Sequence, residues 1–232
     1  MQFILEISLV SLFVFLYCIF VFAKDDFILL RKNITLEQLF NISFVIYILG
    51  FLFARLVYVL EHISPKYLDP FVLFLFPYFP GLSISGGILI GIAYLLIILN
   101  KKRLPFFRVF DIFSISFIYA FSAGLPIFAV IEFLLTRKIP FIPAIEAILY
   151  FVLAVILTLL FVKNKIKDGS TVYLGISFFS LFFIAFSIQI TKGKISFNFT
   201  PEDVVLVFIW FFFFAMFFYQ QNEFQLAGKK KK

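Results

Sequence analysis

Arg55, Ser85 and Glu146 are polar side chains inside long apolar runs, where such groups need a partner or a cavity. Arg55 and Glu146 each lie about five residues, roughly 8 Å along a helix, from one end of their runs. A guanidinium binds phosphate oxygens bidentately, and a carboxylate can accept a proton or hold an arginine in place. Ser85 can donate a hydrogen bond but cannot act as a base at neutral pH. Two interpretations stay open: a site for a phosphate-bearing ligand, or a structural ion pair between Arg55 and Glu146.

Ser85 stands in a stretch of small residues, GLSISGGILIGIAYL, at positions 81–95. Small residues in a membrane helix permit the close approach of another helix or of a lipid headgroup. The spacing of Gly87 and Gly91 also fits the small-xxx-small pattern of packed helices. The sequence alone favours neither explanation.

The composition places the chain in a membrane, because 63% of its residues are hydrophobic, the mean hydropathy is +1.11 and only 14% are charged. Runs of about 20 apolar residues, without the period-two alternation of a porin strand, predict transmembrane helices. Seven such runs lie near 3–23, 39–60, 83–99, 110–135, 141–162, 171–190 and 203–219. We therefore expect an all-α polytopic membrane protein with one seven-helix transmembrane domain, residues 1–222, and a basic cytoplasmic tail, residues 223–232. The first run lacks a basic start and a small-x-small site, so we expect it to remain as a helix.

Most of the 20 lysine and arginine residues fall in alternate connections and in the tail. They are Lys24, Arg31, Lys32, Lys101, Lys102, Arg103, Arg108, Lys163, Lys165, Lys167 and Lys229 to Lys232. By the positive-inside rule these segments are cytoplasmic. We therefore expect the N-terminus on the outer side of the plasma membrane and the C-terminus on its cytoplasmic side. The net charge of +7 is then a topology signal and an attraction to anionic lipid, and no nucleic-acid partner is expected.

This orientation brings most of the intramembrane polar residues to the outer half. They are Glu6, Arg55, Ser83, Ser85, Glu132, Glu146 and Gln189, whereas Asp111 lies at the cytoplasmic end. For Glu6, Glu132 and Gln189 we favour snorkelling to the nearby interface. Residues 61–82, EHISPKYLDPFVLFLFPYFPGL, contain four prolines and cannot form one continuous helix. They are either an outer interfacial arm between the second and third helices, folded over the bundle mouth, or an ordinary apolar loop.

Five segments, in their order along the chain, resemble the bacterial prolipoprotein diacylglyceryl transferase family. They are ITLEQLFNISFVIYILGFLFARLVYVL at 34–60, LSISGGILIG at 82–91, LPFFRVFDIFS at 104–114, EAIL at 146–149 and FTPEDVVLVFIW at 199–210. The family moves a diacylglyceryl group from phosphatidylglycerol to the lipobox cysteine of a lipoprotein precursor. The resemblance implies seven helices, an outside N-terminus and an outer arm in the bacterial plasma (inner) membrane. It implies lipid binding by Arg55, Tyr58, Gly86 and Gly87, and catalytic roles for Ser85 and Glu146.

The chain departs from the family pattern at its polar positions. Ser85 stands where the family has the histidine of its Ser-x-His-Gly-Gly segment. FSAGLPIFAVIEF, residues 121–133, lacks the arginine and asparagines of the family signature, and the Gln-x-Tyr expected before Glu146 is missing. The arginine and glutamate expected in the sixth helix are also absent from SFFSLFFIAF, residues 177–186. His62, the one histidine, lies on the outer side and is a candidate to replace the missing one. Whether the chain is an enzyme therefore stays open.

Three classes of function remain. The first is a diacylglyceryl transferase, and the second is a catalytically degenerate relative that binds lipid or lipoprotein precursor without transfer. A transporter is the third and least favoured class, because the sequence shows no inverted repeat of the kind that many transporters contain. The expected partners are phosphatidylglycerol or another anionic phospholipid and the signal peptide of a lipoprotein precursor. Cys18, the single cysteine, offers neither a disulfide nor a metal cluster, so no cofactor and no metal are expected.

Overall fold

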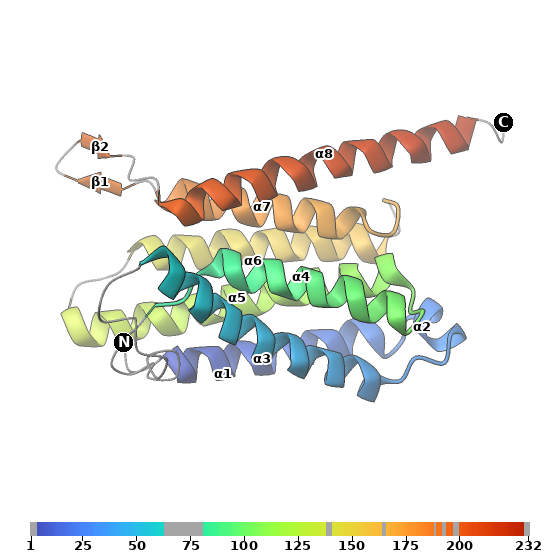
Figure 1. The fold of residues 1–232 in the computed structure, drawn as a ribbon, viewed down its shortest axis with the longest axis horizontal. Coiled ribbons are helices and arrows are strands. Elements are labelled where there is room, and N and C mark those ends of the chain that lie inside the picture. The colour runs from blue at the N-terminus through green and yellow to red at the C-terminus, as the bar shows by residue number, and fades with distance from the viewer. Residues whose placement is uncertain are drawn as a thin grey trace.

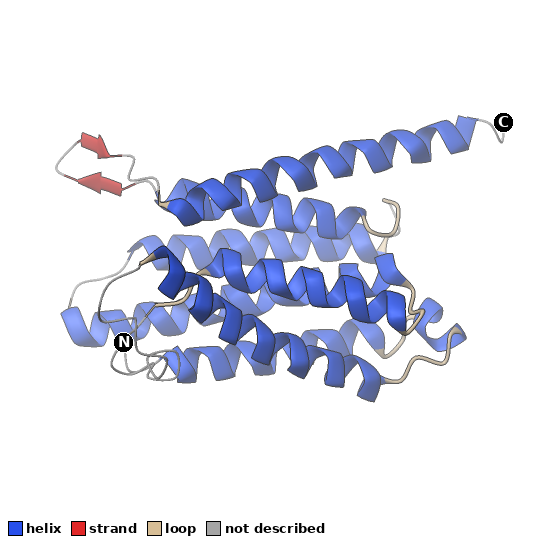
Figure 2. Ribbon diagram, viewed as in Figure 1, coloured by secondary structure: helices blue, strands red, loops and turns tan. Residues whose placement is uncertain are grey.

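The helices of the chain lie side by side along one long direction, and a short β-hairpin stands at one end (Figures 1 and 2). The computed structural model describes residues 4–62, 81–137, 141–163, 166–187, 189–191, 194–196 and 200–229. The helices are α1 (Ile4–Ala23), α2 (Phe27–Arg31), α3 (Leu36–Glu61), α4 (Ile84–Lys101), α5 (Phe106–Thr136), α6 (Phe141–Val162), α7 (Ser170–Ser187) and α8 (Pro201–Lys229). Strands β1 (Gln189–Thr191) and β2 (Lys194–Ser196) pair antiparallel between α7 and α8.

Six helices in the described residues are long and apolar enough to cross a membrane: α1, α3, α4, α5, α6 and α8. The prediction of long apolar helices is therefore confirmed for six of the seven expected spans. α7 is a shorter apolar helix, and the run predicted at 171–190 is wrong at its end, because Gln189 and Ile190 belong to β1. The β-branched residues of the hairpin favour strand over helix there. Of the predicted outer arm, residues 63–80 lie outside the described residues.

Side-chain caps fix where several helices begin. The Asp26 carboxylate accepts the N–H groups of Ile28 (3.0 Å) and Leu29 (3.1 Å) and so starts α2, a short helix that the hydropathy pattern did not predict. Thr35 caps α3 through the N–H of Gln38 (3.2 Å). At the other end of the chain, α8 continues through Lys229, beyond the boundary predicted at 222 and past the end of α7 in Figure 1.

α5 lies at the centre of the packing. It packs against α1, α6 and α7, while α3 pairs with α4 and α7 pairs with α8. Aromatic rings join these helices in the interior: the Phe121 ring lies 4.9 Å from Phe179 and 5.0 Å from Tyr150, and Phe117 lies 5.2 Å from Phe179. The two pairs of Phe121 are edge-to-face, and aromatic pairs at such distances add to the stability that burial supplies.

The end of the bundle predicted to be cytoplasmic is tied together by a partly buried polar cluster. Arg108 Nε donates to Asp26 (2.7 Å), its Nη1 donates to Asp168 (3.1 Å), and its guanidinium lies 3.9 Å from the centre of the Phe161 ring. The Asp111 carboxylate accepts the N–H groups of Gly169 (2.6 Å) and Val172 (2.8 Å), and so caps α7 from another helix. The Arg-x-x-Asp segment thus has a structural role in linking α2, α5 and α7.

Candidate functional site

Gly86 and Gly87 lie at the contact between α3 and α4, but they face different neighbours. A Cβ atom on Gly86 would lie 2.7 Å from Val57 Cβ and 3.1 Å from the Phe53 carbonyl oxygen, so only glycine fits. A Cβ atom on Gly87 would meet nothing closer than the Gly50 carbonyl oxygen at 3.5 Å, which is an ordinary contact. Gly86 therefore sets the approach of the two helices, while Gly87 leaves space.

Arg55 is buried on α3 near its C-terminal end, with 1% of its surface exposed. Its Nη1 donates to the carbonyl oxygen of Gly81 at 2.9 Å, and its guanidinium lies 5.7 Å from the centre of the Tyr58 ring. Tyr58 in turn stacks on the His62 ring at 4.3 Å. The guanidinium therefore points at the backbone that leads into α4, with an aromatic ring beside it.

The segment that opens α4 carries a second polar group of contacts, which we call the serine cluster: Ser83, Ser85 and Glu202. The hydroxyls of Ser83 and Ser85, both buried, lie 2.9 Å apart. Glu202 Oε1 accepts the Ser83 hydroxyl at 3.1 Å and the backbone N–H of Ser85 at 3.0 Å. The Ser83 N–H donates to the Ala54 carbonyl oxygen at 2.9 Å, which holds the cluster against α3 beside Arg55. Residues 81–85 thus lie between an arginine from α3 and a carboxylate from α8.

Glu146 lies elsewhere in the bundle. It is half-buried on α6, a helix that packs against α5 and α7, and the described residues contain no hydrogen bond or ion pair between Glu146 and Arg55. Of the predicted site residues, the structure brings Arg55, Tyr58, Ser85, Gly86 and Gly87 together and leaves Glu146 apart. The structural ion pair between Arg55 and Glu146, one of the two interpretations that the sequence left open, is not among the contacts of the described residues.

Sequence reasoning missed Glu202 as a site residue. The stretch Thr200-Pro201-Glu202-Asp203 has an ordinary helix start, in which Asp203 accepts the N–H and hydroxyl of Thr200 at 2.8 Å each. An acidic residue in a first turn is explained by the dipole of its own helix. Nothing in that pattern signals a contact with Ser83, which lies 119 positions earlier in the chain.

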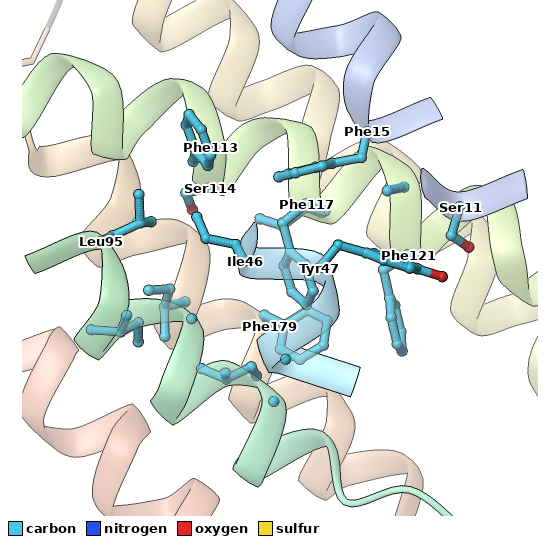
Figure 3. A pocket seen from close by; sticks show the side chains of 18 of the residues that line it. Ser11, Phe15, Ile46, Tyr47, Leu95, Phe113, Ser114, Phe117, Phe121 and Phe179 are labelled. Atoms are coloured by element: carbon cyan, nitrogen blue, oxygen red, sulfur yellow. The ribbon is translucent and has the colours of Figure 1, made fainter. Parts of the chain in front are cut away.

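An apolar cavity of about 300 Å³ lies between the helices of the bundle (Figure 3). It is enclosed by α1, α3, α4, α5 and α7, and its lining contains Phe15, Phe113, Phe117, Phe121 and Phe179 but no charged side chain. Gly87 and Gly91 also line it, and they stand roughly 3 Å and 9 Å along α4 from Ser85. Such a volume is at the small end of ligand pockets, which span roughly 300–1,000 Å³. Its lining suits hydrocarbon.

The arrangement defines a multi-pass membrane protein with a polar site at one end of its bundle and an apolar cavity between α1, α3, α4, α5 and α7. The sequence profile of the prolipoprotein diacylglyceryl transferase family matches residues 6–125, more than half of the chain. The chain therefore belongs to the prolipoprotein diacylglyceryl transferase family. A comparison with curated proteins finds no matching sequence. The matched region contains Arg55, Tyr58 and the start of α4, but neither Glu146 nor Glu202.

Proposed function

We propose that this protein transfers a diacylglyceryl group from phosphatidylglycerol to the cysteine thiol of a lipoprotein precursor. The observation that carries the proposal is the buried Arg55, whose guanidinium is fixed at the start of α4, one turn from the Phe51 that lines the apolar cavity. Membership of the family supports a lipoprotein-modifying membrane transferase.

In the proposed complex, Arg55 binds the lipid phosphate, because a guanidinium donates to two phosphate oxygens at once. Gly87, which leaves space, lets the glycerol backbone approach α4, and Tyr58 lies beside the headgroup, while Gly86 is occupied in the contact with α3. An acyl chain of the lipid extends into the cavity, whose phenylalanine lining matches hydrocarbon.

The proposed reaction is a displacement at carbon. The cysteine sulfur bonds to the glycerol carbon, the bond from that carbon to the phosphate oxygen breaks, and glycerol phosphate leaves. Arg55 and the Ser85 hydroxyl stabilise the charge that grows on the departing phosphate. The thiol proton must pass to a base, and Glu146, which the sequence suggested for this role, lies apart from Arg55 and Ser85.

The proposal includes an orientation in the bacterial plasma membrane. We propose that α7 completes seven spans, with the N-terminus outside and the C-terminus in the cytoplasm. The serine cluster and Arg55 then face the outer side, where the signal peptide of a lipoprotein precursor presents its lipobox cysteine.

A relative that binds lipid or precursor without transfer is the second candidate. The observation that favours it concerns Ser85, which replaces the histidine expected from the family pattern. Its N–H is bound to Glu202 and its hydroxyl to Ser83, so both of its polar groups have partners inside the protein.

The test uses the purified protein in nanodiscs that contain phosphatidylglycerol, with a lipobox peptide as acceptor. Mass spectrometry of the peptide should detect a thioether-linked diacylglyceryl group. Arg55→Leu should abolish both the product and the retention of phosphatidylglycerol in native mass spectrometry, while the melting temperature changes little. Arg31→Leu, which removes an exposed arginine at the far end of the bundle, is the matched control. A peptide that stays unmodified by the wild-type protein would refute transfer and leave the binding function.

A further inference from the structure

Glu202 is held in a fixed orientation at the start of α4 by two donors from another helix. Its Oε1 accepts the Ser83 hydroxyl and the Ser85 N–H, at 3.1 and 3.0 Å. Its Oε2 receives no hydrogen bond in the described part of the chain, and the side chain is half-exposed. One oxygen is therefore used for positioning, and the other is available to a ligand.

The contact also stabilises a negative charge on Glu202. The first N–H groups of a helix carry a partial positive charge, and Glu202 reaches those of α4 from the first turn of α8. A carboxylate that is already bound to fixed donors does not need to reorganise when it accepts a proton. Glu61, at the end of α3, lies near both Ser83 and Glu202 and is the neighbouring carboxylate.

Arg55 and Glu202 contact the same short segment without pairing with each other. Arg55 donates to Gly81, Glu202 accepts from Ser83 and Ser85, and no ion pair joins these two side chains in the described part of the chain. A separated cation and carboxylate are the two groups that the displacement requires. The cation meets the departing phosphate, and the carboxylate meets the attacking thiol.

We propose that Glu202 accepts the proton of the attacking cysteine thiol, an assignment that rests on the transfer function proposed above. The S–H proton passes to Oε2 as the sulfur–carbon bond forms. The carbon–oxygen bond to the phosphate breaks, and its electron pair stays on the phosphate oxygen. Glu202 then returns the proton to the released glycerol phosphate, so the carboxylate is regenerated.

Glu202→Gln is the direct test, because the amide oxygen can still accept both hydrogen bonds but the side chain no longer takes a proton. In nanodiscs with phosphatidylglycerol and a lipobox peptide, kcat should fall by about 100-fold or more, with lipid retention and melting temperature preserved. Glu6→Gln, a change at an exposed position of α1, is the matched control.

The pH profile separates a proton acceptor from a structural residue. A free thiol ionises near pH 8.5, so a rise from pH 7 to pH 9.5 supplies thiolate without a base. The deficit of Glu202→Gln relative to the wild type should therefore shrink by roughly tenfold or more over that interval. The deficit of Arg55→Leu should not shrink, since the departing phosphate still lacks its cation.

The outcomes distinguish this assignment from the function on which it rests. An active wild-type protein whose Glu202→Gln variant keeps the wild-type rate and pH profile would overturn the role of Glu202 alone. Loss of transfer in Glu146→Gln or Glu61→Gln, with rescue at high pH, would move the role to that residue and also overturn the assignment. If Glu202→Gln does not fold, Glu202→Asp is the second variant, because it keeps the charge but shortens the side chain by one methylene. Full transfer activity of a folded Glu202→Asp variant would show that Glu202 has a structural role and would overturn the assignment. An inactive wild-type protein would overturn both proposals.

Discussion

Gly86→Ala should separate the role of glycine in helix packing from a role in lipid binding. The added Cβ would lie 2.7 Å from Val57 Cβ, 2.8 Å from Val57 Cγ2 and 3.1 Å from the Phe53 carbonyl oxygen. Carbon atoms in favourable contact are about 3.5–4.0 Å apart, so α3 and α4 would have to separate by about 1 Å. Neither neighbour yields easily, because one is backbone and the other is a β-branched side chain with a single preferred rotamer in a helix.

The magnitude follows from two opposing terms. Overpacking costs about 1–3 kcal/mol, and the better helix propensity of alanine returns up to about 1 kcal/mol. Gly87→Ala gains the same propensity without the clash, since its nearest neighbour would lie at 3.5 Å. The two variants should therefore differ by about 1–3 kcal/mol in unfolding free energy, with Gly86→Ala the less stable. Because about 1 kcal/mol shifts the melting temperature of a chain of this size by roughly 2–4 °C, the difference is measurable.

Thermal melts of both variants in the same detergent provide the assay. The double variant Gly86→Ala with Val57→Ala should recover part of the loss, because it removes Val57 Cγ2, at 2.8 Å, but leaves Val57 Cβ in place. Equal melting temperatures for the two single variants would refute the packing argument. So would a double variant that is no more stable than Gly86→Ala.

Three further predictions concern the orientation and the polar cluster at the opposite end. In a variant that lacks Cys18, single cysteines introduced in 61–82 should react with an impermeant maleimide on intact cells. Single cysteines introduced in 101–108 should react only after the membrane is opened. The reverse pattern would show that the proposed orientation is inverted. Asp111→Asn leaves one amide oxygen in place of two carboxylate oxygens that accept hydrogen bonds, so the free energy of unfolding should fall by about 1.5–3 kcal/mol. Chemical denaturation measures this change, and an unchanged stability would contradict the capping role of Asp111. Arg108→Met leaves the buried Asp26 without its ion-pair partner and should cost about 3–5 kcal/mol, whereas a loss under about 1 kcal/mol would show that the pair contributes little.

The candidate site combines residues that the sequence predicted with a residue that only the structure revealed. Arg55 was predicted as a binding residue because an arginine within an apolar run demands a partner, and its burial agrees with that demand. Glu146 met the same criterion on its own helix, but it lies apart from Arg55. Glu202 gave no such signal, since an acidic residue in the first turn of a helix has a local explanation. Polarity within a run thus predicts that a residue has a partner, but not which partner.

The sequence by itself determined the six long apolar helices, because the length of an apolar run is a local property that hydrocarbon and backbone hydrogen bonding fix. It also placed Arg55, Ser83 and Ser85 at the same end of the bundle, since depth follows from position along each helix. Only the tertiary structure decided which of them meet: that Arg55 reaches Gly81, that Glu202 reaches Ser83 and Ser85, and that Gly86 rather than Gly87 sets the helix contact. These contacts depend on how each helix is rotated and which helices are neighbours. Both are set by side-chain packing between segments far apart in the chain, which no local pattern encodes.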